Sequence, residues 1–238
     1  MRKDADKMKS WAKKVKRLTK VLLCGIVATT IIPISVNAVV PCGTSGDGYR
    51  CHTNSTDGGY HHTYGDKIMN YGVGDYGNHR RYYWTSGLDS TTEKLAASAV
   101  SNWVNTSGSG GPGVYTPISI RKTSTKSDAV FEIVKNENLG QSTLAVTRFY
   151  MYNREIKVNS NGVLPENYGW SQVQLHLSLM DDYTQNEREA TIAHELGHAM
   201  GLSHQNCRTS SVMCSFAYGG TAKRADKKDL RAINHLYA

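Results

Sequence analysis

Three histidines and a glutamate lie within eleven residues of the chain, at a spacing that suits a metal ion. Residues 194–204 read HELGHAMGLSH. His194 and His198 are four residues apart, so on a helix their imidazoles project from one face. Two nitrogen ligands at this spacing can hold Zn²⁺. Glu195, beside the first ligand, could take a proton from a zinc-bound water without ligating the metal.

A turn is needed to complete this ligand set. Gly201 can leave a helix with positive φ at little steric cost, and the returning chain would bring in His204. Three protein ligands leave one position open to water, which is typical of catalytic zinc. The sequence therefore predicts one catalytic Zn²⁺ on His194, His198 and His204, with Glu195 as catalytic base. The alternative, a helix with solvated histidines, is disfavoured by five fitting residues over eleven positions.

The elements that must position these side chains predict an α+β fold. A Ser90–Glu93 capping box opens a helix that ends near Val104. A second box, Thr184–Glu187, opens the metal-binding helix, which runs through Met200. A last helix, capped by Asp226, spans 227–237. Five strands are indicated by apolar runs or by alternation, at 80–85, 118–120, 129–134, 143–149 and 173–179.

The first 38 residues are typical of a secretion signal. A basic flank precedes an apolar core that starts at Val21, and Val36–Ala38 fits the small-x-small rule for cleavage. The alternative is an uncleaved membrane anchor, since the run is about long enough to cross a bilayer. Pro33 and the small polar residues after it favour cleavage after Ala38. We therefore expect a secreted, extracellular protein.

The positive charge of the chain is concentrated in this leader. The formal net charge is +8, but residues 1–38 hold nine of the 28 Lys and Arg and two of the 20 Asp and Glu. The remaining body has 19 bases against 18 acids, and this near neutrality argues against electrostatic nucleic-acid binding. The predicted organisation is a signal peptide at 1–38, an N-terminal extension at 39–79 and a catalytic domain at 80–238.

Four cysteines remain after removal of the leader: Cys42, Cys51, Cys207 and Cys214. An even number in an exported protein predicts disulfides, although four cysteines allow three connectivities and some thiols could stay free. The local pairs, Cys42–Cys51 and Cys207–Cys214, are preferred because their partners are close in sequence. A Cys207–Cys214 bond would tie the loop after His204 to the segment around Met213.

Two further segments make the chain resemble a known family. With residues 194–204, the run Ser211–Val–Met213 resembles the Met-turn of the metzincin metallopeptidases, and residues 229–237 are similar to the last helix of the matrixin branch. The resemblance implies a twisted five-stranded mixed sheet with two long helices, an active-site cleft, and a small C-terminal subdomain. It also implies that Met213 packs beneath the metal site.

The activity that this resemblance implies is that of a zinc endopeptidase. Its substrate would be an extended peptide, antiparallel to the edge strand at 143–149. We expect a monomer without membrane contact after signal cleavage. Two alternatives stay open: a non-catalytic zinc-containing module that binds peptides, and a membrane-tethered surface protein.

The sequence also departs from the matrixin pattern. Asp181 and Asp182 could bind Ca²⁺, but their spacing differs from the family's acidic run, so calcium is unsupported. Of the family's structural-zinc ligands only His176 aligns, and a solvated histidine is the favoured interpretation. Pro41–Cys42–Gly43 lacks the Arg of the inhibitory cysteine-switch motif. Tyr218 is a candidate oxyanion donor by position alone.

Overall fold

The computed structural model describes residues 51–54, 59–107, 111–206, 208–216 and 219–238. The predicted leader lies outside this range, as do Cys42, Cys207 and Tyr218. The predictions that rest on those residues therefore stay predictions. Among the described residues, no helix combines the length and apolar character needed to cross a membrane.

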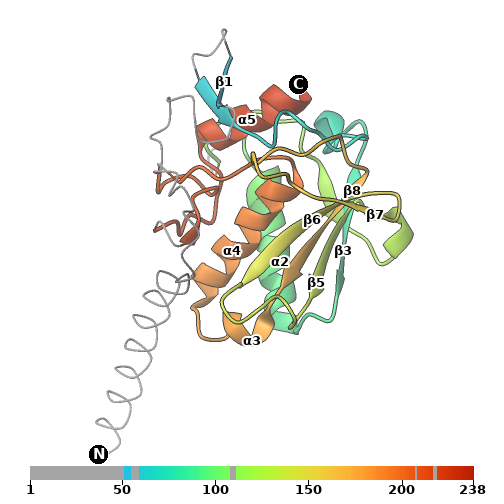
Figure 1. Ribbon diagram of the computed structural model, residues 1–238, viewed down its shortest axis with the longest axis vertical. Helices are drawn as coiled ribbons and strands as arrows, with labels where there is room; N and C mark the ends of the chain where they lie inside the picture. The colour runs from blue at the N-terminus through green and yellow to red at the C-terminus, as the bar shows by residue number, and fades with distance from the viewer. Residues whose placement is uncertain (1–50, 55–58, 108–110, 207, 217–218) are drawn as a thin grey trace, which may run out of the picture.

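One mixed sheet forms the body of the molecule, with strand order β4-β3-β5-β8-β6-β7 (Figure 1). Its strands are β3 (Arg81–Ser86), β4 (Ile120–Lys122), β5 (Phe131–Lys135), β6 (Ala145–Met151), β7 (Arg154–Ile156) and β8 (Trp170–Leu175). The first four strands of this order run parallel, and β6 is antiparallel to both β8 and β7. Each of the five predicted strands overlaps an observed one, although the strand predicted at 118–120 shares only Ile120 with β4, and the prediction of a five-stranded sheet missed β7. β7 reads Arg–Glu–Ile, and its single apolar residue shows neither an apolar run nor an alternation.

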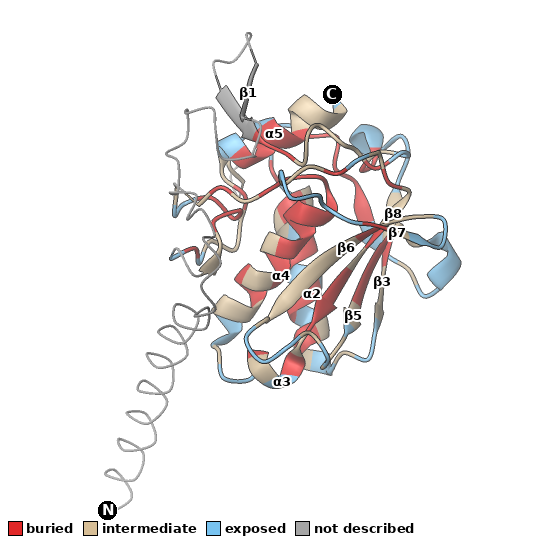
Figure 2. Cartoon of the chain, in the orientation of Figure 1, coloured by how far each residue is buried: buried red, intermediate tan, exposed pale blue. Residues whose placement is uncertain are grey.

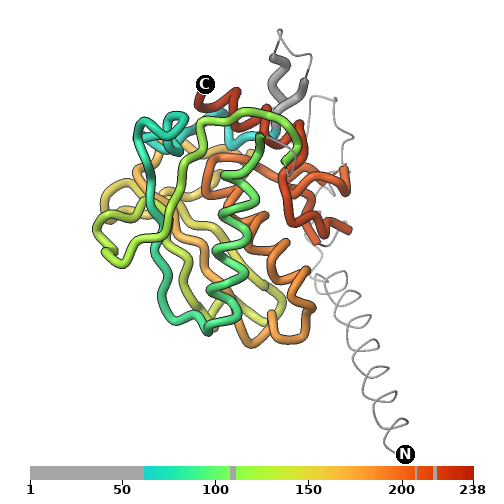
Figure 3. The backbone as a smooth tube through the Cα atoms, turned by 180° about the vertical axis from the view of Figure 1, so that it is seen from behind, coloured from blue at the N-terminus to red at the C-terminus, as the bar shows by residue number. Residues whose placement is uncertain are grey.

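Two long helices pack side by side on one face of this sheet, as Figures 1 and 3 show. They are α2 (Ser90–Val104) and α4 (Gln185–Ala199). Figure 2 shows the buried residues lining the layer between the helices and the sheet. The predicted apolar face of α2, which includes Leu95, Ala99 and Trp103, is buried there. Trp103 Nε1 donates to the Ala193 carbonyl at 2.9 Å, which fixes α2 against α4.

Of the two predicted capping boxes, the first was wrong in detail. The N-cap of α2 is Asp89 and not Ser90, because the Asp89 carboxylate accepts the Thr91 and Thr92 amides. Glu93 does not complete a box with Ser90 and instead accepts a hydrogen bond from the Thr85 hydroxyl at 2.7 Å. The capping box of α4, Thr184–Glu187, is present as predicted.

The strand predicted at 173–179 ends early. β8 stops at Leu175, and His176 caps the short helix α3 (Leu177–Met180). Leu177 and Met180 are three residues apart, so one helical turn buries both. Leu177 fits both patterns, but Leu179, which continues the alternation, is only half-buried.

The N-terminal part of the described chain packs into the same core. A hairpin of β1 (Cys51–Asn54) and β2 (Gly59–His62) leads into a segment that buries Met69 and Val73. The Met69 amide donates to the hydroxyl of Tyr237, near the end of α5 (Lys227–Tyr237). The described residues also form two 3₁₀ turns, η1 (Asp75–Gly77) and η2 (Lys126–Asp128). Part of the predicted extension at 39–79 thus shares the core of the sheet and helices.

Candidate metal centre

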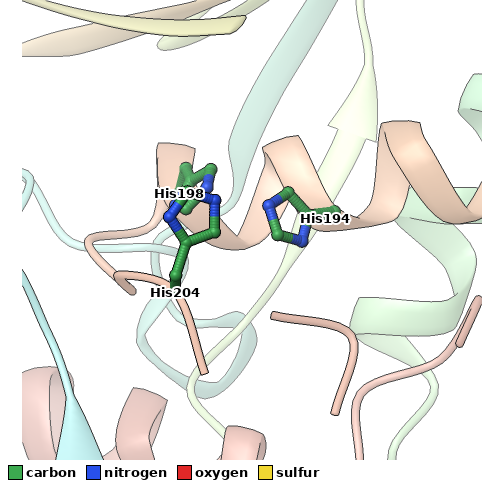
Figure 4. A group of neighbouring side chains, drawn as sticks. All are labelled: His194, His198 and His204. Carbon is green, nitrogen blue, oxygen red and sulfur yellow. The ribbon is translucent and has the colours of Figure 1, made fainter. Parts of the chain in front are cut away.

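The three predicted histidines converge at the end of α4. His194 and His198 project from the helix and His204 reaches them from the following loop, as Figure 4 shows. Their candidate ligand atoms all lie within 4.8 Å of one another. Within the described part of the chain, this is the one group of three or more His, Cys, Asp or Glu side chains with that proximity. The arrangement can hold a metal ion.

Gly201 makes the turn that brings His204 back to the helix. Its φ is +97°, in the region that favours glycine. Its amide donates to the His198 carbonyl at 2.8 Å, which closes the end of the helix. A Cβ at this position would also lie 2.8 Å from the Lys67 carbonyl oxygen. The third ligand therefore depends on a residue without a side chain at this turn.

Backbone carbonyls determine which ring nitrogen of the helical histidines is free. His194 Nδ1 lies 2.8 Å from the Val212 carbonyl, and His198 Nδ1 lies 2.7 Å from the Leu202 carbonyl. A carbonyl only accepts, so in both rings Nδ1 carries the proton and Nε2 keeps its lone pair for a metal. The Tyr64 hydroxyl lies 2.9 Å from His198 Nδ1, so the N-terminal segment contacts the second ligand.

Burial keeps these imidazoles neutral. Desolvation, with a smaller contribution from the neighbouring histidines, lowers the pKa of His194 and of His198 to about 3. Burial also lowers the pKa of His204. Neutral imidazole is the form that ligates a metal, and three such nitrogens suit Zn²⁺. The donor set thus fits the ion that the sequence predicts.

These pKa shifts predict that acid destabilises the metal-free protein. In the unfolded chain the histidines protonate below about pH 6.5, whereas in the folded chain His194 and His198 stay neutral to about pH 3. The unfolded state therefore binds more protons, so the free energy of unfolding falls as the pH drops from about 6.5 towards 3. Each histidine contributes up to about 1.4 kcal/mol per pH unit.

Urea unfolding of the chelator-treated protein at pH 7 and pH 5 measures this loss. The double variant H194Q/H198Q has no group at these positions that titrates in this range, so its stability should fall less over the same interval. An equal pH dependence in the two proteins would contradict the predicted role of the buried histidines.

Glu195 lies beside the ligand cluster. Its side chain is buried, and its Oε2 accepts a hydrogen bond from the Thr147 hydroxyl on β6 at 2.7 Å. The close group of ligand atoms consists of the three histidines and does not include this carboxylate. Its position next to His194 can therefore serve proton transfer and leaves the metal to the imidazoles.

Ser211–Met213 passes beneath the metal-binding helix. The Val212 carbonyl holds His194, and the Met213 carbonyl accepts the Gln205 amide at 2.8 Å. A Cβ on Gly197, which lies between the two helical ligands, would overlap the Met213 sulfur. The structure thus places the Met213 side chain directly against α4 below the histidines.

Asp229 organises this turn, and the sequence analysis did not identify it. From α5 its carboxylate accepts the Ser211 hydroxyl at 2.6 Å, the Val212 amide at 3.0 Å and Arg208 Nη2 at 3.1 Å. Burial and the nearby Asp226 raise the pKa of Asp229 to about 6. Its one sequence signal is its place three residues after the Asp226 cap, where it completes a capping box.

Other predicted site residues do not join the cluster. His176 Nδ1 lies 2.9 Å from Glu137 Oε2, and Asp181 pairs with Arg188. Cys214 is buried directly after Met213. Since Cys207 lies outside the described residues, their disulfide stays a prediction, as does the Cys42–Cys51 bond.

The predicted active-site cleft also stays a prediction. A hollow that the structure outlines includes Trp84, Lys126 and Glu132 in its lining. Trp84 and Glu132 follow Tyr83 and Phe131, which are buried against the helices, so they belong to the other face of the sheet. This hollow is therefore separate from the histidines.

Comparisons with known proteins place the chain in a family. The family model Peptidase_M10, described as Matrixin, matches residues 115–238, just over half of the chain. No curated protein matches the sequence significantly. A solved structure of myroilysin is similar with 13% identity and a TM-score of 0.42, covering 66% of this chain and 79% of that one. On the family match, the protein belongs to the matrixins, a family of zinc metallopeptidases.

Proposed function

We propose that the protein is a secreted zinc endopeptidase that cleaves internal bonds of extended polypeptides. The observation that carries this proposal is the convergence of three neutral imidazoles beside the carboxylate of Glu195. A module that only held zinc or bound peptides would not need a carboxylate there. The active form is proposed to be a monomer.

Each residue of the site has a separate role in this proposal. His194, His198 and His204 would hold Zn²⁺, which when bound supplies a Lewis acid that activates water and polarises the scissile carbonyl. Glu195 accepts a proton from the attacking water, whose oxygen bonds to the carbonyl carbon. Glu195 then passes that proton to the amine nitrogen as the C–N bond breaks.

The edge of β6 supports an extended substrate. β7 pairs with β6 only at Phe149–Met151, so within the described residues the outer edge of Ala145–Arg148 is open. The His176 amide donates to the Leu144 carbonyl, and antiparallel pairing alternates along the strand. The N–H and C=O groups of Ala145 and Thr147 therefore face the open edge. An added peptide strand would pair there, and the open edge suits a segment within a longer chain.

The proposed export begins with cleavage after Ala38. The packing of Met69 and Val73 in the core, and the contact of Tyr64 with His198, favour a mature chain that keeps these residues. N-terminal sequencing of the exported protein should find a start near Val39. A start beyond about residue 75 would contradict this proposal and indicate a removed propeptide.

Incubation with denatured casein tests the proposed activity. We expect internal fragments, their loss with a zinc chelator and their return with added zinc. Metal analysis should find about one zinc per chain, because a single complete ligand group is present in the described residues. Casein that is bound but never cleaved would favour the non-catalytic alternative. Two tightly bound zinc ions per chain would contradict a single site.

A further inference from the structure

One side chain outside the metal-binding helix holds the carboxylate of Glu195. Thr147 Oγ1 lies 2.7 Å from Glu195 Oε2 and 2.9 Å from the Glu195 carbonyl oxygen. Among the described residues, Thr147 is the one side chain that hydrogen-bonds this carboxylate. We propose that Thr147 is the positioning residue for Glu195. This inference rests on the proposed peptidase function.

The hydroxyl of Thr147 can donate only to Glu195. A Thr hydroxyl has one proton, and both acceptors within reach belong to Glu195. The contact with Oε2 leaves Oε1 as the oxygen that can receive a proton from the attacking water. Without this contact the glutamate side chain can occupy several rotamers, and ordering them carries an entropic cost. Thr147 is well suited to the task because a β-branched side chain on a strand has little freedom at χ1.

The same residue faces the proposed substrate. The alternation along β6 directs the backbone N–H and C=O of Thr147 to the open edge, while its hydroxyl points to α4. A peptide paired with this edge and the carboxylate of Glu195 would therefore both be positioned by Thr147. Loss of the hydroxyl removes the contact that positions Glu195 and leaves the backbone pairing with the peptide in place.

This separation predicts a specific kinetic effect. Thr147→Val keeps the shape and the β-branch but removes the donor. We expect kcat for zinc-loaded protein to fall about 10- to 100-fold, because misplacing a general base loses much of its contribution. KM should change less than about twofold, and the zinc dissociation constant should stay that of the wild type. Thr147→Ser, which restores a hydroxyl, should recover most of kcat.

Thr85→Val is the matched control. Thr85 is also a strand threonine whose hydroxyl holds a helix glutamate, with Oγ1 2.7 Å from Glu93 Oε1. Both valine variants lose one Thr–Glu hydrogen bond between the sheet and a helix, so they should lower the unfolding midpoint by similar amounts. Only Thr147→Val should lower kcat.

A double variant tests whether Thr147 acts through Glu195. In the Glu195→Gln background, which already lacks the carboxylate base, Thr147→Val should cause no further loss of the residual rate. The inference is overturned by any of three results: wild-type kcat in Thr147→Val, a raised KM alone, or a loss of equal size in both backgrounds. If the wild-type protein cleaves no peptide, both the proposed function and this inference fail. If the wild type cleaves and Thr147→Val equals it, only this inference fails.

Discussion

Glu195→Ala is expected to lower kcat/KM for peptide cleavage by about a thousandfold or more while one zinc per chain stays bound. General base catalysis contributes about 10²- to 10⁴-fold, and within the described residues the ligand group holds no carboxylate that could replace Glu195. Zinc should stay because the carbonyls of Val212 and Leu202, and not Glu195, orient the helical ligands. Metal analysis and turnover of an internally quenched peptide measure both quantities.

A second buried glutamate on α4 is the control for this experiment. Glu189 is also buried, but it binds Ser98, Asn102 and Lys223 between α2 and α4, away from the metal site. Glu189→Gln should lower stability and leave kcat near that of the wild type. Loss of zinc in Glu195→Ala, or turnover at the wild-type rate, would contradict the role given to Glu195.

Asp229→Ala should have the largest effect on stability. Its carboxylate accepts hydrogen bonds from Ser211, Val212 and Arg208, and its side chain is almost fully buried. Removal leaves the buried Val212 amide and Ser211 hydroxyl without their acceptor, while Arg208 keeps its ion pair with Asp226. Each lost hydrogen bond to a carboxylate costs about 1.5–3 kcal/mol. Because the Val212 carbonyl holds His194, a loosened turn should also weaken zinc binding about 10- to 100-fold.

Urea unfolding and competition with a chromophoric chelator check both parts of this prediction. Asp229→Asn keeps the shape and one acceptor oxygen, so its losses should be intermediate. Asp181→Ala removes a partner that is itself exposed, and Arg188 keeps Asp89 and Thr92, so neither quantity should change much. Wild-type zinc affinity in Asp229→Ala would separate the turn from the metal site.

The sequence by itself determined the features that depend on neighbours within a few residues. His194 and His198 share a face because a helix repeats every 3.6 residues, and Gly201 permits the turn that returns His204. The first residues of α4 and α5 follow from their N-caps, because a cap bonds to amides within the first turn. The prediction was wrong where two neighbouring residues could both cap α2, namely Asp89 and Ser90. Glu93 accepts a hydrogen bond from Thr85 and so does not complete a box with Ser90, and Asp89 is the cap.

The tertiary structure decided which distant residues support the site. Tyr64 and His198 are 134 residues apart, and Thr147 and Glu195 are 48 apart. Asp229 lies 18 residues from Ser211 and reaches it only because α5 packs beneath the turn. Such contacts have no periodic pattern in a single sequence, because they arise when separate elements are packed into one core. Local spacing therefore predicts the ligands, while the groups that orient them become visible only in the folded chain.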